Sequence, residues 1–183
     1  AGCPGITATS HLRTASNFST YADKDLTFVI VAARQNGNVN YFFANQSSGN
    51  NTGAFLGYVN GTTFRFGLAG PNGTPAISVN RPAYSGTPEL EVWIARLDTE
   101  VGSELPGLKL YRNGELVASD PSVTSQQATA VTIPYLGTQR SENSSSRFLF
   151  SEFITYSRAL NALELCELTT YLNGKYNLTM NCP

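Results

Sequence analysis

The sequence predicts an all-β fold in which two antiparallel sheets pack as a sandwich, with one short helix near the C-terminus. About eight to ten strand-like segments are separated by turns every ~8–12 residues, the spacing typical of sandwiches. Asn113-Gly114 lies between two apolar runs, which is the strongest short signal for a β-hairpin. Only residues 161–174 carry a convincing helical pattern.

The predicted strands differ in how their apolar residues alternate. Residues 26–33 form a continuous β-branched run of the kind that is buried on both faces of a sheet. In residues 62–69 apolar and polar side chains alternate, so Phe64 and Arg65 point to opposite faces. The other predicted strands are residues 39–44, 54–59, 89–98, 108–119 (a hairpin), 131–138 and 147–156.

Residues 161–174 carry the signals of a helix at both ends. Asn161 is a good N-cap, and Glu164 three residues later completes an Asn version of the capping box. Leucines then follow at helical spacing, and Gly174 is placed as a C-terminal stop. The helix is therefore predicted to begin after Asn161 and to end at Gly174.

Charge is sparse and balanced, with 12 Lys and Arg against 13 Asp and Glu and a single histidine. No basic patch or run stands out, so nucleic acid and anionic membranes are not expected partners. No apolar run approaches the ~20 residues of a membrane span, so membrane insertion is not expected. Abundant Ser, Thr, Asn and Gly are typical of extracellular β-proteins. Residues 1–14 lack an apolar leader, which indicates a mature fragment or an excised domain.

The three cysteines, Cys3, Cys166 and Cys182, permit one disulfide and leave one thiol over. Their spacing fits neither a zinc site nor a CxxC redox pair. The pairing of Cys166 with Cys182 is favoured because the short tail after the helix can fold back. A bridge from Cys3 to either partner remains an alternative.

The segment SEFITYSRALNALELCELTTYLNGKY, residues 151–176, runs from a predicted strand into the predicted helix. Its distinctive positions are Glu152, Tyr156, Arg158-Ala159-Leu160, Glu164, Tyr171-Leu172 and Lys175-Tyr176. This pattern resembles the C-terminal signature of the laminin-G-like modules of the concanavalin A-like lectin/glucanase superfamily. The segments LKLYRNGELVAS and LTFVIVAAR also resemble the hairpin and the early buried strand of that family.

The resemblance implies a jelly roll of two antiparallel sheets, one of them concave. It implies a single laminin-G-like domain over residues 1–183, with residues 1–20 as an N-terminal segment and residues 161–174 as the helix. Members of the family include sugar-binding lectins, glycan hydrolases and adhesion modules. A fold by itself does not decide among these functions.

The sequence does not predict an enzyme. Glycan hydrolysis needs two carboxylates roughly 5–5.5 Å apart in retaining enzymes and farther apart in inverting ones. The superfamily's β-glucanases carry them as Glu-x-Asp-x-x-Glu, a motif that is absent here; Glu89-Leu90-Glu91 and Asp98-Thr99-Glu100 are the nearest approaches. His11 lies in no nucleophile motif. A polysaccharide hydrolase or lyase that uses Glu91 or Glu152 stays an alternative.

Calcium is the one cofactor that the sequence leaves open, because hard cations take loop carboxylates and carbonyls without fixed spacing. Asp98, Glu100 and Glu104 lie in one predicted connection and are the first candidates. Asp23 and Asp25 are the second. Both sets also suit ordinary solvated loops, and no cofactor is expected to be required.

Sugar binding uses aromatic rings for stacking and amide or guanidinium groups for paired hydrogen bonds. Strand alternation predicts that Tyr41, Tyr58 and Arg65 point out of the core. Trp93 also suits core packing, and Arg65 suits an ordinary exposed strand position. The candidate ligand-binding residues are Tyr41, Asn45, Asn50, Tyr58, Arg65, Trp93, Gln139, Arg140 and Asn143.

The sequence therefore predicts a non-catalytic, lectin-like adhesion module of a larger surface or filament-associated protein that is secreted or displayed on a cell surface. Its expected partners are glycans or glycoproteins, together with other modules or subunits of a surface assembly. A protein-binding or spacer module without a sugar site is the first alternative. Glu152 is expected to be largely buried and hydrogen-bonded, with Arg158 as a local partner, and both are assigned structural roles.

Overall fold

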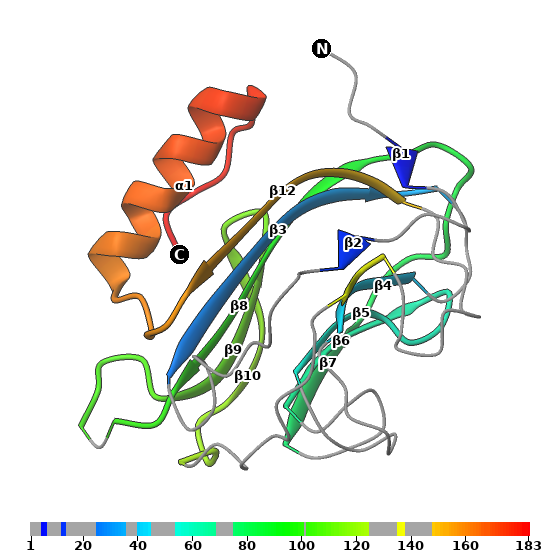
Figure 1. Cartoon of the computed structure of the whole chain (residues 1–183). Helices are drawn as coiled ribbons and strands as arrows, with labels where there is room; N and C mark the ends of the chain where they lie inside the picture. Colours follow the sequence, from blue (N-terminus) through cyan, green and yellow to red (C-terminus); the bar gives the residue numbers. More distant parts are fainter. Residues whose placement is uncertain are drawn as a thin grey trace.

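Two antiparallel sheets face each other in the computed structural model, and a helix packs along the outer face of one of them (Figure 1). The structure describes residues 5–6, 12–13, 25–35, 40–44, 54–68, 75–100, 102–124, 135–137 and 148–183. None of the helical residues in these ranges forms a helix long and apolar enough to cross a membrane. The predicted two-sheet jelly-roll sandwich with a C-terminal helix is confirmed.

Both sheets interleave strands that are distant in the sequence. Sheet A has the order β1 (Gly5–Ile6), β12 (Phe148–Tyr156), β3 (Leu26–Arg34), β8 (Leu90–Asp98), β9 (Gly107–Arg112) and β10 (Glu115–Asp120). Sheet B has the order β2 (Leu12–Arg13), β11 (Tyr135–Leu136), β4 (Asn40–Ala44), β5 (Phe55–Tyr58), β6 (Thr63–Gly67) and β7 (Ala76–Asn80). The crossovers between the sheets bring the ends of β3, β8 and β9 next to connections from sheet B.

Aromatic side chains fill the space between the sheets. Phe64 of β6 and Trp93 of β8 stack with ring centroids 3.5 Å apart and an interplanar angle of 7°. Phe28 of β3 meets Phe66 of β6 edge to face at 6.4 Å. All four side chains are fully buried. Burial of apolar area at roughly 25 cal/mol per Å² makes this core the main stabilising element.

Strand β3 lies in the interior of sheet A and is buried on both faces, as its unbroken apolar sequence predicts. Phe28 and Ile30 belong to the core between the sheets. Val29 and Val31 belong to a second cluster on the outer face, where the helix packs. One strand therefore contributes to both cores.

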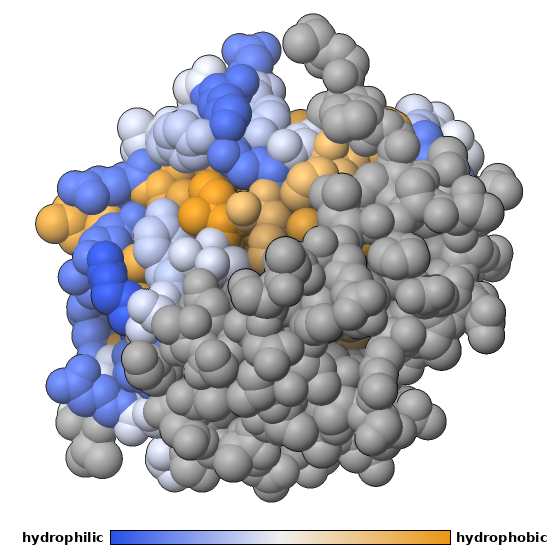
Figure 2. All heavy atoms as spheres, viewed as in Figure 1, coloured by the Kyte–Doolittle hydropathy of each residue, from blue (hydrophilic) through white to orange (hydrophobic). Residues whose placement is uncertain are grey.

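Helix α1 (Ala162–Tyr176) covers the outer face of sheet A through Leu165, Leu168 and Leu172. The capping box is confirmed: the Asn161 side chain accepts from the Glu164 amide, and the Glu164 carboxylate accepts from the Asn161 amide, both at 2.9 Å. Figure 2 shows an apolar band beside the helix, over the region of β12 in Figure 1, while the helix surface is mainly hydrophilic.

The predicted helix end at Gly174 is wrong. The helix continues to Tyr176, and its C-cap is Asn177 in the left-handed conformation with φ 53° and ψ 48°. The Leu178 amide then donates to the Asn173 carbonyl at 3.1 Å. Asparagine tolerates left-handed backbone better than most residues, so it ends the helix in place of glycine.

The tail after α1 folds back along the helix (Figure 1). The side-chain amide of Asn173 donates to the Met180 carbonyl and accepts from the Met180 amide, both at 2.9 Å. A disulfide joins Cys166 to Cys182 with a Cα–Cα distance of 4.6 Å, the pairing that the sequence favours. Cys3 lies outside the described residues.

The predicted turn between β9 and β10 is present and supports this tail. Asn113 and Gly114 both have left-handed backbone, with φ 48° and 82°. A Cβ atom on Gly114 would collide with the backbone carbonyl of Asn181 in the tail. Glycine at this position therefore serves both the turn and the approach of the tail.

Three of the observed strands are not predicted from the sequence. β7 is short and lies between Gly- and Pro-rich stretches, and β1 and β2 are only two residues each. Of the predicted strand 131–138, the structure describes residues 135–137, where β11 pairs with β2 and β4. Such short segments form strands because they pair with neighbouring strands, and the periodicity of their own residues does not reveal those neighbours.

Loss of the disulfide should destabilise the fold. Replacing both Cys166 and Cys182 by Ser should lower the free energy of unfolding by about 3 kcal/mol, because the closed loop of 16 residues restricts the unfolded chain. Urea unfolding of the double variant measures this change. Cys3→Ser is the control and should leave stability within about 0.5 kcal/mol of the original chain. Equal losses in both variants would contradict the pairing.

Candidate functional site

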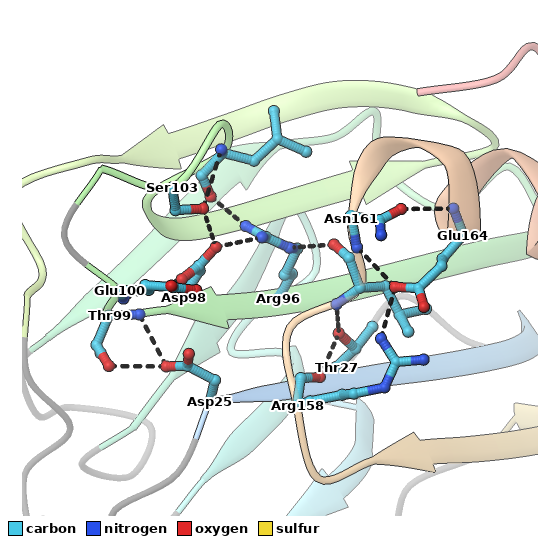
Figure 3. Close-up of polar contacts among 12 residues, drawn as sticks. Asp25, Thr27, Arg96, Asp98, Thr99, Glu100, Ser103, Arg158, Asn161 and Glu164 are labelled. Atoms are coloured by element: carbon cyan, nitrogen blue, oxygen red, sulfur yellow. Dashed lines mark hydrogen bonds and ion pairs between the residues drawn. The ribbon is translucent and has the colours of Figure 1, made fainter.

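Polar side chains gather at opposite ends of β3 and β8. At one end, Asp25, Thr27, Arg96 and Asp98 meet the turn between β12 and α1; we name these residues, with Arg158 and Glu164, the helix-start cluster (Figure 3). At the other end, Arg34 and Glu91 face a small cavity closed by residues 81–89; we name this cavity the arginine pocket. The hydrogen bonds at these two sites show which of them has donor or acceptor groups that no protein partner uses.

Thr27 holds the chain just before the helix begins. Its hydroxyl donates to the Arg158 carbonyl and accepts from the Leu160 amide, both at 3.1 Å (Figure 3). The Arg158 side chain forms an ion pair with Glu164 at 2.5 Å. The Arg158-Ala159-Leu160 segment is therefore held both through its backbone and through the Arg158 side chain.

Arg96 is fully engaged inside the helix-start cluster. Its Nε donates to the Leu160 carbonyl at 2.7 Å, and its two Nη atoms donate to the Leu105 carbonyl and to the Asp98 carboxylate. Arg96 and Asp98 are 2% and 4% exposed, so the pair is removed from water. Breaking one partner of such a buried pair is strongly destabilising.

Asp98 is engaged as completely as Arg96. Burial alone would raise the pKa of Asp98, but hydrogen bonds from Ser103, the Glu100 amide and Arg96 outweigh burial and hold it below its usual value. Asp25 accepts from the Thr99 amide and hydroxyl, both at 2.8 Å. These contacts hold the connection after β8 in place.

The same contacts bear on the calcium candidates. Glu100 and Glu104 are exposed, and Asp98 is occupied by protein donors. Within the described ranges, no three His, Cys, Asp or Glu side chains are grouped so that they could hold a metal ion. Asp23 lies outside these ranges. Calcium binding stays a prediction without a described ligand set.

Glu152 is hydrogen-bonded, as predicted, but the predicted partner is wrong. Its carboxylate accepts from Tyr171 and Tyr176 at 3.0 Å and from Lys175 at 2.8 Å, all on α1. Arg158 is paired with the capping glutamate instead. Burial would raise the pKa of Glu152, but the Lys175, Tyr171 and Tyr176 hydrogen bonds lower it below its usual value. Glu152 therefore ties the helix to β12.

Two hollows next to α1 are larger than the arginine pocket. One, of about 580 Å³, lies between β12 and α1; the other, of about 380 Å³, lies over the helix-start cluster. Both volumes fall in the range of ligand sites. However, their central polar groups, Glu152, Arg158, Glu164, Arg96 and Asp98, already bond to one another or to backbone. Their arrangement serves to attach the helix.

The arginine pocket is built around a buried carboxylate. Glu91 is 3% exposed. Its Oε2 accepts from the Tyr58 hydroxyl at 2.9 Å and from the Trp93 indole at 3.0 Å, and its Oε1 accepts from Arg112 Nε at 3.0 Å. Arg81 Nη2 lies 3.5 Å from Oε1. Burial and the Glu91 carboxylate raise the pKa of Tyr58, so its hydroxyl stays a donor.

Two further guanidinium groups line this pocket. Arg34 donates to the carbonyls of Gly61 at 3.0 Å and Pro82 at 3.2 Å, and it lies 4.1 Å above the Tyr58 ring. Arg81 has a buried Nε without a hydrogen-bond partner among the described residues. The cavity measures about 120 Å³, and its rim includes the exposed Ser85 and Thr87 and the partly exposed Tyr84. The pocket therefore contains a buried donor, Arg81 Nε, that no described protein group accepts from.

The structure divides the predicted sugar-binding residues. Tyr58 and Trp93 are fully buried, so the prediction that Tyr58 points outward is wrong and the core alternative for Trp93 is right. The register of β5 turns Tyr58 inward, where its hydroxyl finds Glu91. Asn45, Asn50, Gln139, Arg140 and Asn143 lie outside the described residues.

Arg65 lies on the outer face of sheet B and is partly exposed. The backbone register aligns Tyr41 with Gly57, Gly57 with Arg65, and Arg65 with Ser78. The Tyr41 side chain lies outside the described part of the chain. Arg65 is therefore the one predicted ligand residue of this face whose side chain can be placed.

Arg34, Arg81 and Arg112 are not among the site residues that the sequence predicts. A signal for Arg34 is present: Leu26, Phe28 and Ile30 face inward, and the same alternation carries Arg34 inward at the end of the strand. A charge at an inward position indicates a buried partner or a site. Arg112 carries the same signal, because Leu108 and Leu110 face inward before it on β9. Arg81 carries no such signal, because it lies just after the short strand β7.

A family model described as "Concanavalin A-like lectin/glucanases superfamily" matches residues 7–166. No curated protein matches the sequence. The Ruminococcus gnavus IT-sialidase CBM40 bound to alpha2,6 sialyllactose is similar in structure, with 18% identity and a TM-score of 0.69 over 92% of this chain and 97% of that chain.

Two further solved structures share the fold. The SAP-like pentraxin from Limulus polyphemus is 15% identical, with a TM-score of 0.61 over 87% of this chain and 76% of that chain. The binding domain of botulinum neurotoxin DC in complex with rat synaptotagmin II is 13% identical, with a TM-score of 0.57 over 81% and 36%. At these identities the similarity concerns the fold.

Removing the Thr27 hydroxyl tests the helix-start cluster. Thr27→Val keeps the shape but leaves the Leu160 amide without its acceptor, which should cost about 1–3 kcal/mol of unfolding free energy. Thr170→Val is the matched control, because that exposed hydroxyl only bonds back to the Cys166 carbonyl; its effect should stay within about 0.5 kcal/mol. Equal effects would contradict a fastening role.

The Glu152 contacts predict a pH dependence. Because the folded pKa of Glu152 lies below its usual 4.5, its stabilising effect is complete above that pH and is lost as the pH falls through the folded value. Glu152→Gln should therefore be less stable at pH 7, by about 1–2 kcal/mol, and the difference should shrink near pH 3. Urea unfolding at both pH values measures it. The exposed Glu167→Gln should show no such trend.

Proposed function

This chain belongs to the concanavalin A-like lectin/glucanases superfamily, and we propose that it is a non-catalytic glycan-binding module. The observation that carries the proposal is the arginine pocket, which combines a buried, unpartnered guanidinium nitrogen with a polar rim. Guanidinium groups hold oxygen-rich ligands through paired hydrogen bonds. The pocket therefore has the donors that recognition of a sugar requires.

The described carboxylates argue against glycan hydrolysis. An acid and a base or nucleophile must both face the substrate. Glu91 accepts from Tyr58, Trp93 and Arg112, and Glu152 accepts from three residues of α1. Both carboxylates are thus already held by protein donors, which favours a structural role for each. The similar CBM40 structure, of which this chain covers 97%, belongs to a binding module by name.

The wider context of the proposal is a secreted or cell-surface protein in which residues 1–183 form one module and mediate adhesion. The disulfide is consistent with an oxidising compartment. Glycans or glycoproteins are the partners, other modules of a surface assembly can join them, and no cofactor is required. The botulinum neurotoxin domain in complex with synaptotagmin II supports a second candidate, a protein-binding module.

A glycan array tests the proposal. The purified chain should bind a limited set of glycans, retain that binding in EDTA, and release no reducing sugar from the bound glycans on long incubation. Binding only with calcium would refute the absence of a cofactor. No binding with or without calcium would refute the glycan-binding function and favour the protein-binding alternative. Slow release of sugar would refute the non-catalytic assignment.

A further inference from the structure

The charges at the arginine pocket are unequal. Arg34 and Arg81 line it, and Arg112 stands beside Glu91, so three guanidinium groups are present. The carboxylates are Glu91 and Glu89, and the Glu89 side chain is 74% exposed. Arg112 bridges both carboxylates, with Nη2 3.0 Å from Glu91 and 3.5 Å from Glu89. Three guanidinium groups against two carboxylates leave the pocket with one net positive charge.

The two lining arginines are incompletely paired. The hydrogen-bond acceptors of Arg34 are neutral carbonyls, those of Gly61 and Pro82. Arg81 reaches Glu91 only at 3.5 Å, and its buried Nε lacks a partner among the described residues. Burying a cation without a close anion is costly, and an arriving anion relieves that cost. The pocket is therefore prepared for a negatively charged group.

The size of the cavity limits what can occupy it. Ligand sites that enclose a whole small molecule usually measure about 300–1,000 Å³, whereas this cavity measures about 120 Å³. It admits one substituent of a sugar, while the ring stays at the rim beside Tyr84, Ser85 and Thr87. A planar carboxylate matches the flat fork of a guanidinium, with two oxygens for two N–H groups.

We infer that the arginine pocket binds the carboxylate of an acidic sugar, such as a uronic or sialic acid, through Arg81 and Arg34. This inference rests on the proposed glycan-binding function and names its ligand class. A single negative charge balances the net charge of the pocket, while a doubly charged phosphate would add repulsion from Glu89 and Glu91. The rim hydroxyls of Tyr84, Ser85 and Thr87 then bond to the sugar hydroxyls.

The test is isothermal titration of the whole chain with four ligands: sialyllactose, a glucuronate disaccharide, lactose and 3′-sulfated lactose. At least one carboxylated sugar should bind about tenfold or more tightly than lactose, since a hydrogen bond to a charged group is worth that factor or more. Arg81→Gln should abolish the preference. Its unfolding curve should stay close to the original, because Glu91 keeps its hydrogen bonds from Tyr58, Trp93 and Arg112.

Two controls separate charge from site. Lys109→Gln removes the same charge from the outer face of sheet A, outside the pocket, and should keep the preference. Arg81→Lys keeps the charge but loses the planar fork, and should weaken carboxylate binding several-fold. Preference that survives Arg81→Gln would overturn the assignment of the site, as would a loss in Lys109→Gln equal to that in Arg81→Gln.

The remaining outcomes distinguish this inference from the proposed function. Equal binding of lactose and the carboxylated sugars would overturn the inference and leave glycan binding standing. Sulfated lactose that binds as tightly as the carboxylated sugars would overturn the preference for a planar carboxylate. If none of the four ligands binds while the glycan array shows other, neutral glycans, the inference fails alone. If the chain binds no glycan on the array, both the inference and the proposed glycan-binding function are refuted.

Discussion

A carboxylate buried between two β-sheets must be surrounded by hydrogen-bond donors, and Glu91 imposes that requirement on this sandwich. Its donors come from both sheets: Tyr58 from β5, and Trp93 and Arg112 from β8 and β9. The same two aromatic side chains pack in the core, where Trp93 stacks on Phe64. One buried charge thus orients part of the aromatic core, and Arg81 and Arg112 lie beside it.

Strand β8 carries a second buried pair at its other end, with the opposite consequence. Arg96 and Asp98 satisfy each other and bond to the backbone of the neighbouring turns, so the helix-start cluster is a closed network. At the arginine pocket the network stays open, because Arg81 keeps a buried nitrogen without a partner. The end that attaches the helix (Figure 3) therefore has its charged groups bonded, whereas the arginine pocket retains an unpartnered donor.

Local signals predicted those parts of the fold that depend on neighbouring residues. The capping box at Asn161, the turn at Asn113-Gly114 and the double burial of β3 all agree with the structure. The helix end was misplaced for a local reason, since Asn177 and not Gly174 adopts the left-handed cap. Two other errors depended on tertiary neighbours. Tyr58 turned inward because Glu91 lies there, and Arg158 paired with Glu164 because α1 brings other donors to Glu152.

The sequence by itself determined the sandwich, its C-terminal helix and the family, since periodicity, capping and the C-terminal motif act over short stretches. It also placed Glu152 and Arg158 in structural roles. Only the tertiary structure decided which polar groups meet at the arginine pocket, because Arg34, Arg81 and Glu91 belong to three separate segments that meet through the crossovers between sheets. A side chain's remaining capacity for hydrogen bonds depends on those neighbours, and sequence spacing does not contain that information.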